Sequence, residues 1–403
     1  MAIRLHVPLS RLLALAAAAL IALLWQPSSS AAASSPSTRH PTAQFPAMPG
    51  EVELVPRLDR PANARMPAEK DLVGYAMVYF KDATHSVYLA ISRDGYSFTD
   101  VNGGKPVIDG RKVAEQRGVR DPFITRGPDG AFYMGMTDMH ASGQRAGVRS
   151  TAWERPEAEY GWGNNRALVL MKSWDLIRWT AHSFRLDIAW PEQFAEVGCV
   201  WAPHMIFDEA EGRMFLTFTS KIRRGVDDIF WSYTDEDFTR LVTQPSVLLA
   251  QPRPDGPITD QNRDPLHVID SDITKAGGRY HLFYSSKING AAGIYLASSA
   301  SLSSGFAAST KRVDPEAVNT EGPTVFKRLG TDRYVLMYDV YGAGNMGFSE
   351  TSDFVTFTSL GRFNEGVMKG TNFSAPKHGG VTYLTLGELK AIAAHWKVDM
   401  KLD

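Results

Sequence analysis

The stretch Ala167 to Thr180, ALVLMKSWDLIRWT, indicates the fold, because an apolar strand runs directly into a polar turn and a closing aromatic residue. The aromatic run Phe132 to Thr137 lies upstream and completes a paired unit of two strands. This unit occurs five times along the chain, and such internal repetition is typical of modular architectures. The other four copies open at Tyr75, Met214, Tyr280 and Tyr334.

The repeat predicts an all-β fold. From residue 71 onward, short aromatic and β-branched runs alternate with Gly, Asp, Asn and Ser turns, and no long stretch shows helical periodicity. The first copy lacks an upstream strand, whereas the C-terminal run His378 to Leu386 is a strand without partners of its own. We therefore predict a five-bladed β-propeller closed by a C-terminal strand that completes the N-terminal blade, with a pair of β-sandwiches as the alternative. Four copies carry their own upstream strand, opening at Asp121, Trp201, Ile269 and Glu321.

Composition excludes several classes of protein. The 43 Lys and Arg residues nearly balance the 44 Asp and Glu residues, for a formal net charge of −1, which argues against a nucleic-acid partner. A hydrophobic content of 44% argues against disorder. The single cysteine, Cys199, cannot form an internal disulfide or a cysteine-based zinc site, and we interpret it as a buried apolar residue.

The N-terminal residues indicate export. Arg4 and Arg11 precede an apolar run from Leu12 to Trp25 and a small-residue stretch, the layout of a secretory signal. A membrane anchor is the alternative, but the run is shorter than the roughly 20 residues that a spanning helix needs. We expect a secreted or periplasmic protein without a membrane partner. Its predicted parts are a signal peptide over 1–33, a linker or irregular arm over 34–70 and the propeller domain over 71–403.

Three acidic residues fall at the starts of strands expected to line the central channel: Asp121, Asp270 and Glu321. Carboxylates crowded into a channel repel one another and lose hydration, so their convergence suggests a function. Cleavage of a glycosidic bond needs such a set. One acid protonates the leaving oxygen, a carboxylate activates water, and a third charge keeps the pKa of the acid high.

Several motifs in order give the sequence a clear resemblance from about Gly74 to Leu386. It resembles glycoside hydrolase family 43, whose five-bladed propeller enzymes include β-xylosidases, α-L-arabinofuranosidases and arabinanases. The motifs are Arg120-Asp121-Pro122 ahead of Gly130-Ala131-Phe132-Tyr133, Trp201-Ala202-Pro203, Ile269-Asp270 ahead of Gly278-Arg279-Tyr280, Glu321-Gly322-Pro323, and the late His378.

The resemblance implies roles for these residues. Asp121 would be the general base, Glu321 the general acid, and Asp270 the residue that modulates the pKa of the acid and orients it. The family inverts the anomeric centre, which fits a base and an acid roughly 6.5–9.5 Å apart with a water between them. His378 would lie in the channel near a calcium ion or a water cluster. The resemblance therefore implies no required cofactor, with a structural calcium ion as an option.

Residues next to these motifs are expected to bind the carbohydrate substrate: Arg120, Trp201 and His204. Relatives commonly carry an acidic residue where His204 follows Trp-Ala-Pro, so the recognised sugar can differ from the usual pentoses. Trp201 is equally well interpreted as an ordinary core residue. Asp264 and Asp272 compete with Asp270 for its role, and the spacing to the next strand favours Asp270.

A long aromatic loop from Ala141 to Asn165 is predicted to cover the funnel and to restrict attack to chain ends. A surface loop that covers its own small cluster is the alternative. The loop carries Arg145, Arg149, Trp153, Tyr160 and Trp162.

The sequence thus predicts an exported, inverting, exo-acting glycosidase for arabinofuranosyl or xylosyl linkages of plant-type polysaccharides or oligosaccharides. The alternatives are a non-catalytic carbohydrate-binding propeller and a related propeller enzyme acting on fructosides or galactosides, or transferring glycosyl groups to phosphate.

Overall fold

The structure is a computed structural model that describes residues 49–148, 155–288 and 290–402. The predicted signal peptide lies outside the described residues, as do Arg149 and Trp153 of the long loop. Within the described ranges, no helix is both long enough and apolar enough to cross a membrane.

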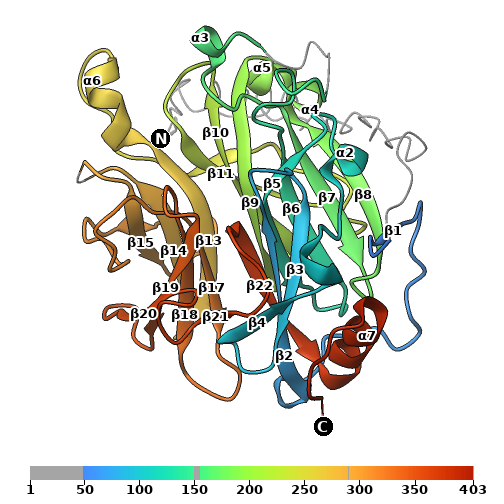
Figure 1. The fold of residues 1–403 in the computed structure, drawn as a ribbon. Coiled ribbons are helices and arrows are strands. Elements are labelled where there is room, and N and C mark those ends of the chain that lie inside the picture. Colours follow the sequence, from blue (N-terminus) through green and yellow to red (C-terminus); the bar gives the residue numbers. More distant parts are fainter. Residues whose placement is uncertain (1–48, 149–154, 289, 403) are drawn as a thin grey trace, which may run out of the picture. The chain divides into compact units, whose positions relative to one another are not determined.

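Five β-sheets follow one another along the chain as the blades of a propeller (Figure 1). Their innermost strands contact one another in a closed ring, in the order β22, β5, β9, β13, β17 and back to β22. The first blade contains β2 (Leu72–Phe80), β3 (Val87–Ser92), β4 (Ser97–Asp100), β21 (Lys369–Gly370) and β22 (Lys377–Thr385). The second contains β1 (Glu53–Leu54), β5 (Val119–Arg126), β6 (Phe132–Asp138), β7 (Ala167–Ser173) and β8 (Arg178–Arg185).

The remaining three blades have four strands each. The third contains β9 (Val197–Asp208), β10 (Arg213–Ile222), β11 (Asp228–Tyr233) and β12 (Ser246–Leu249). The fourth contains β13 (Val268–Ala276), β14 (Arg279–Ser286), β15 (Gly293–Ser299) and β16 (Ala307–Ala308). The fifth contains β17 (Glu321–Lys327), β18 (Tyr334–Val340), β19 (Asn345–Thr351) and β20 (Thr358–Arg362).

The ring closes as predicted. Strand β22 pairs antiparallel with β2, from Leu72 opposite Thr385 to Phe80 opposite Lys377, so the C-terminal strand is the innermost strand of the first blade. Adjacent blades then share five hydrophobic clusters, one at each junction. Because every strand face meets a neighbouring blade, nearly every strand residue in the inner half of a blade is buried.

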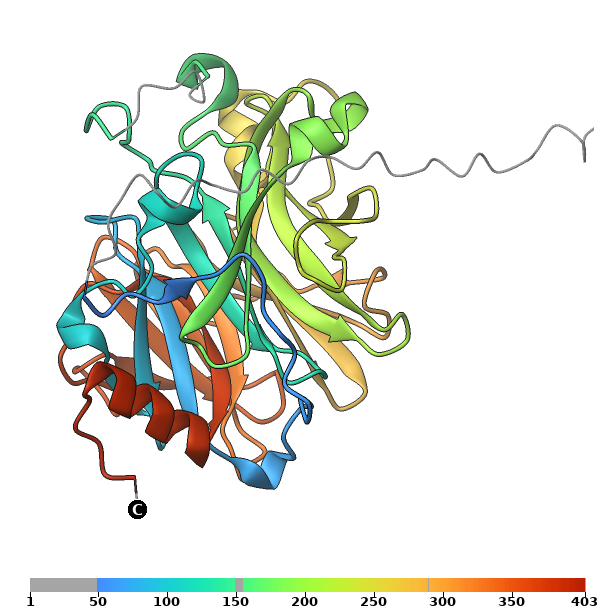
Figure 2. The same ribbon diagram turned by 90° about the vertical axis from the view of Figure 1, so that its right-hand side faces the viewer.

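The sequence did not predict a helix at the C-terminus. The chain continues from β22 into helix α7 (Leu386–Trp396), which packs against β2 and β22 (Figure 2). A capping box starts it, since the Thr385 hydroxyl accepts from the Glu388 N–H and the Glu388 carboxylate accepts from the Thr385 N–H. The helix buries Leu389, Ile392 and Trp396.

Part of the predicted arm also joins the propeller. Strand β1 pairs in parallel with β8 at the outer edge of the second blade, and the Gly50 carbonyl accepts a hydrogen bond of 2.6 Å from the Trp396 indole.

The other described helices are single turns: α2 (Gly110–Val113), α3 (Glu157–Tyr160), α4 (Leu186–Ala189), α5 (Pro191–Phe194), α6 (Asp260–Arg263) and the 3-10 turns η2 (Glu69–Asp71), η3 (Asn102–Gly104) and η4 (Asp264–Leu266).

Candidate active site

The candidate site lies where each of the five innermost strands carries a β-bulge. At the bulge, pairing with the second strand of the blade shifts register, and one residue adopts a left-handed backbone conformation. This conformation is uncommon outside glycine, so its recurrence at equivalent positions is a feature of the repeat. The bulge residues and their φ angles are Asp121 (50°), Ala202 (45°), Asp270 (56°), Gly322 (60°) and His378 (22°).

The residues that precede the bulges form a second set of equivalent positions. Around the ring from the first blade to the fifth, they are Lys377, Arg120, Trp201, Ile269 and Glu321. The two sets together bring Asp121, Asp270 and Glu321 within electrostatic reach of one another, although 200 residues separate the first from the last. The convergence expected from the sequence is therefore present in the fold.

Asp121 is held as a carboxylate. Its Oδ2 accepts a hydrogen bond of 2.8 Å from the Thr137 hydroxyl, and its Oδ1 lies 3.2 Å from His378 Nδ1. Burial alone would raise the pKa of Asp121, but the hydrogen bond and charge of His378, together with the charge of Arg120, lower it to about 2. Asp121 is therefore ionised at any pH near neutrality.

His378 is the positive partner of this carboxylate. Burial would lower its pKa, but the hydrogen bond and charge of Asp121, followed by the charges of Asp270 and Glu321, raise it to about 9. Its ring requires a glycine next to it, because a Cβ on Gly322 would lie 2.6 Å from His378 Cγ. In the described residues, no group of three or more His, Cys, Asp or Glu side chains is arranged to hold a metal ion. The calcium expected near His378 stays a prediction.

Asp270 occupies the bulge of the fourth blade and is almost fully buried. Its N–H donates to the Thr219 hydroxyl at 3.0 Å, and its Oδ2 accepts from the Gly322 N–H at 3.2 Å. Burial raises its pKa to about 7, and the charges of Glu321 and Asp121 act in the same direction against that of His378. The pKa of Asp270 is therefore shifted in the direction opposite to that of Asp121.

The two competitors of Asp270 lie elsewhere. Asp264 is in the exposed turn η4 and pairs with Lys287 at 2.9 Å. Asp272 is buried two residues beyond the bulge, where its Oδ2 accepts from the Val325 N–H at 3.1 Å. Asp270, in contrast, accepts from the N–H of Gly322, the residue after Glu321, and its pKa is raised by the charges of Glu321 and Asp121.

Glu321 opens β17, and its side chain is 30% exposed. Burial raises its pKa above the ordinary value, while the charges of Lys377 and His378 oppose the rise and that of Asp121 adds to it. The site thus contains one carboxyl group held ionised, Asp121, and two whose pKa values are raised, Glu321 and Asp270. Opposite shifts of this kind are how one site supplies both a base and an acid.

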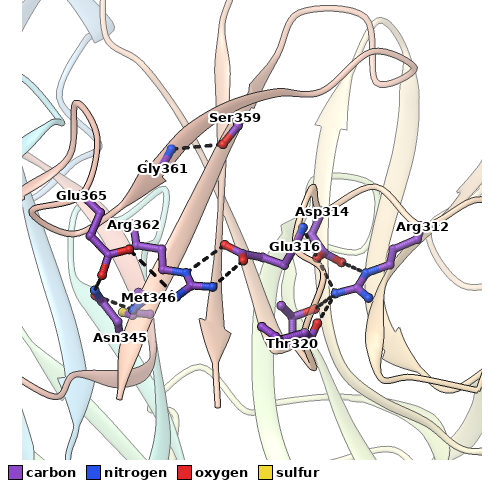
Figure 3. A network of polar contacts seen from close by, with 11 residues as sticks. Arg312, Asp314, Glu316, Thr320, Asn345, Met346, Ser359, Gly361, Arg362 and Glu365 are labelled. Carbon is purple, nitrogen blue, oxygen red and sulfur yellow. Dashed lines mark hydrogen bonds and ion pairs between the residues drawn. The ribbon is translucent and has the colours of Figure 1, made fainter. Parts of the chain in front are cut away.

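A polar network fixes the loop that leads to Glu321 (Figure 3). Arg312 donates two hydrogen bonds of 2.7 Å to Asp314 and one of 3.2 Å to the Thr320 hydroxyl. Glu316 in the same loop accepts from Arg362 of β20 at 2.7 Å, which ties the loop to the fifth blade. Because Thr320 directly precedes Glu321, this network restrains the start of β17.

Two of the three predicted substrate-binding residues border the acids. Arg120 pairs with Asp82 at 2.5 Å, and its guanidinium lies 4.5 Å from the centre of the Phe80 ring. The Trp201 indole donates to the Gly163 carbonyl at 3.0 Å and meets the Trp162 ring edge-on with centroids 6.1 Å apart.

His204 lies deeper between the blades. It is 4% exposed, its Nε2 is 3.4 Å from the Asp272 carboxylate, and its ring centre is 4.1 Å from that of Phe123. The structure therefore places it in contact with other strand residues rather than beside the three acids. Cys199 is fully buried, as predicted, and its thiol lies 3.3 Å from Asp227.

Sequence reasoning missed three charged residues beside Glu321: Lys377, Asp339 and Asp82. Lys377 Nζ lies 3.9 Å from Glu321 Oε1, 3.2 Å from Asp339 Oδ2 and 3.4 Å from Asp82 Oδ2. Alignment of the five bulges would have found Lys377, since it precedes His378 as Glu321 precedes Gly322.

The chain is similar to known glycosyl hydrolases. A family model of the glycosyl hydrolase family 43-related type, described as a probable glycosyl hydrolase domain, matches residues 70–390. An α-L-arabinofuranosidase of Bifidobacterium longum subsp. longum is 25% identical over 238 residues. The match covers 57% of this chain and 21% of that relative, so the chain spans about a fifth of its length.

The solved structures that match this chain share little sequence with it. An exo-1,5-α-L-arabinanase from a bovine ruminal metagenomic library has a TM-score of 0.48 and 16% identity, over 75% of this chain and 99% of that one. An α-L-arabinofuranosidase from Clostridium thermocellum has a TM-score of 0.47 and 12% identity, over 70% of this chain and 84% of that one.

Proposed function

Since this chain belongs to the glycosyl hydrolase family 43-related family, we propose that it hydrolyses glycosidic bonds with inversion, using Asp121 as the base and Glu321 as the acid. The observation that carries the proposal is the opposite shift of the two carboxyl pKa values, to about 2 for Asp121 and upward for Glu321. A base must be ionised and an acid protonated at the same pH, and these shifts provide that combination.

The residues act as follows in this proposal. Asp121 accepts a proton from water, and the oxygen of that water forms a bond to the anomeric carbon. Glu321 gives its proton to the glycosidic oxygen as the bond between that oxygen and the anomeric carbon breaks. His378 and Thr137 orient the Asp121 carboxylate through their contacts with its two oxygens. Asp270, near both groups, raises the pKa of the acid when it is ionised.

The long loop supports attack at chain ends. Trp162 is 54% exposed, and the Arg120 guanidinium lies 5.7 Å from its ring centre, so the indole stands beside the site. A cavity of about 460 Å³ continues from Trp162 and Gly163 past His140 and Arg145. We propose that this cavity accommodates the leaving part of the substrate while the loop limits access to terminal or short side-chain residues.

The proposed substrates are arabinofuranosyl linkages first and xylosyl linkages second, in plant-type polysaccharides or oligosaccharides. Support comes from the relative named α-L-arabinofuranosidase and from the sequence resemblance. Export to the periplasm or the medium is part of the same proposal, since polymeric substrates lie outside the cell. It rests on the N-terminal sequence alone.

The test is a screen of the purified protein against 4-nitrophenyl arabinofuranosides, xylosides, galactosides and fructosides, with Asp121→Asn measured in parallel. We expect release of nitrophenol from the α-L-arabinofuranoside, and a loss of several orders of magnitude in kcat for the variant. Equal rates for both proteins on every substrate would contradict the proposal. Binding of arabino-oligosaccharides without turnover would then favour the non-catalytic propeller.

A further inference from the structure

We infer that Lys377 is a positioning residue for the acid: it holds the Glu321 side chain and stabilises the carboxylate that remains after Glu321 has given up its proton. The inference rests on the proposed function, in which Glu321 is the acid. It adds a residue that the sequence motifs do not include. Lys377 acts through Glu321 and is not proposed to touch the substrate.

The ammonium group of Lys377 lies near three carboxyl groups at once. Its side chain is 17% exposed and lies among three carboxylates from three elements, at 3.2 Å from Asp339 of β18, 3.4 Å from Asp82 after β2 and 3.9 Å from Glu321 of β17. Arg120 of β5 faces the same group and pairs with Asp82. The longest of these separations is that to Glu321, the group that is neutral before the reaction.

Comparison of the five blade junctions shows that this charge cluster is not needed to close the ring. On the second strand of each blade, one residue pairs with the residue that precedes the bulge. At three junctions this residue carries a hydroxyl group that forms one hydrogen bond to the next blade: Thr137 with the Ala202 N–H, Thr219 with the Asp270 N–H and Ser285 with the Thr320 carbonyl.

The two other junctions carry charges. Asp339, opposite Glu321, takes the hydroxyl position and pairs with Lys377, and Phe80, opposite Lys377, carries the Arg120 guanidinium on its ring. Asp339 is 1% exposed, and neither of its oxygens has a partner with hydrogen-bond geometry among the described residues. A buried carboxyl group costs stability where a threonine would serve, so the charged pair at this junction indicates a role beyond packing.

The change of charge during the reaction explains that role. Glu321 begins neutral, and when its proton moves to the glycosidic oxygen a carboxylate forms 3.9 Å from the ammonium group. An oriented cation that gains a partner only as the proton leaves stabilises the transition state more than the ground state. Burial would lower the pKa of Lys377, but the charges of Asp339, Glu321 and Asp82 raise it, so the ammonium stays charged.

The test compares leaving groups that depend differently on proton donation. A 4-nitrophenyl group leaves with little help, whereas the methoxide of a methyl glycoside must be protonated. For Lys377→Met we expect kcat on methyl α-L-arabinofuranoside to fall on the order of 10- to 100-fold, and kcat on the 4-nitrophenyl compound to fall less than about threefold. Lys377→Arg should restore most of the loss on the methyl compound.

Matched variants separate this effect from damage to the fold. Lys172, near the C-terminal end of β7, is 14% exposed and lies 3.2 Å from Asp129. Lys172→Met therefore removes a similarly buried, paired lysine and should leave the ratio of the two rates unchanged. The double variant Lys377→Met with Asp339→Asn avoids leaving a buried carboxylate unpaired and should show the same leaving-group dependence as the single variant.

Each outcome decides the inference. Equal slowing on both substrates, or none, would overturn the role of Lys377. Glu321→Gln is measured alongside: if it slows both substrates equally, the acid assignment fails instead, and the role of Lys377 falls with it. If the wild-type protein cleaves neither compound, the proposed function fails for this substrate class, and so does this inference.

Discussion

At the scale of single residues, the site depends on carboxyl groups whose pKa values are set by different neighbours. Asp121 is kept ionised by His378, whereas burial raises the pKa of Glu321. The pKa of Asp270, about 7, is raised by burial and by the charges of both other acids. The loss of activity as pH rises should therefore reflect loss of the proton from Glu321, whereas Asp121 stays ionised throughout the neutral range.

Asp270→Asn should shift the alkaline limb of the pH profile to lower pH. An ionised Asp270 raises the pKa of Glu321 by the same coupling through which Glu321 raises the pKa of Asp270. Without that charge, Glu321 loses its proton at lower pH, and the active form with a protonated acid is lost earlier as pH rises. The measurement is kcat against pH for both proteins; an alkaline limb that stays in place or moves upward would contradict the coupling.

Gly322→Ala should disturb the contact between Asp121 and His378. A Cβ would lie 2.6 Å from His378 Cγ, and the φ of 60° is unfavourable for alanine by about 1–2 kcal/mol. Gly277→Ala is the matched control, since Gly277 has a φ of 57° and open space around its Cβ position. We expect both variants to lose stability in urea unfolding, and only Gly322→Ala to lose more than about tenfold in kcat/KM. Equal kinetics would show that the glycine serves the backbone alone.

At the scale of elements, loops rather than strands place the acid. The segment before β17 is cross-linked internally by Arg312 and tied to the fifth blade by Glu316 and Arg362 (Figure 3). Strand geometry fixes the bulge residues, but Glu321 lies at the first position of its strand and needs this additional support.

Arg312→Ala should lower kcat by about three- to thirtyfold through misplacement of Glu321, since small displacements of a reacting group reduce rates strongly. Arg185→Ala is the control, because Arg185 pairs with Asp187 at the same two-residue spacing and is exposed to the same extent, 22% against 20%. We expect similar losses of thermal stability and a loss of kcat only for Arg312→Ala. A fall in kcat shared by both variants would remove the network from the account of the site.

At the scale of the whole domain, closure depends on the C-terminal strand. Without β22 the first blade would lose its innermost strand, and the ring would lose both Lys377 and His378. Helix α7 contributes differently, by burying Leu389, Ile392 and Trp396 against strands that are already closed.

Two truncations separate these contributions. A chain that ends at Pro376 should fail to unfold cooperatively, because the first blade loses its innermost strand and the ring loses the contacts of β22 with β5 and β17. A chain that ends at Thr385 should stay closed but lose several kcal/mol, at about 1.5–3 kcal/mol for each buried large side chain. Thermal unfolding followed by near-ultraviolet circular dichroism distinguishes them. A cooperative transition for the shorter chain would contradict the role assigned to β22.

The sequence was sufficient for the blades, because aromatic and β-branched strands with polar turns repeat regardless of tertiary context. It also predicted that Asp121, Asp270 and Glu321 lie on innermost strands, since motifs near strand starts are local. It did not reveal α7, although the Thr385 and Glu388 capping box was present, because one short amphipathic helix has a weak signal beside five blades. Lys377 and Asp339 were missed because their role depends on the junction between the last and first blades.

The most direct test of the central claim, that Asp121 and Glu321 act as base and acid on opposite sides of the anomeric carbon, is the configuration of the first product. Proton NMR of the wild-type protein with 4-nitrophenyl α-L-arabinofuranoside should show β-L-arabinofuranose appearing before mutarotation. Initial formation of the α anomer would require a covalent intermediate on the enzyme and would contradict the account.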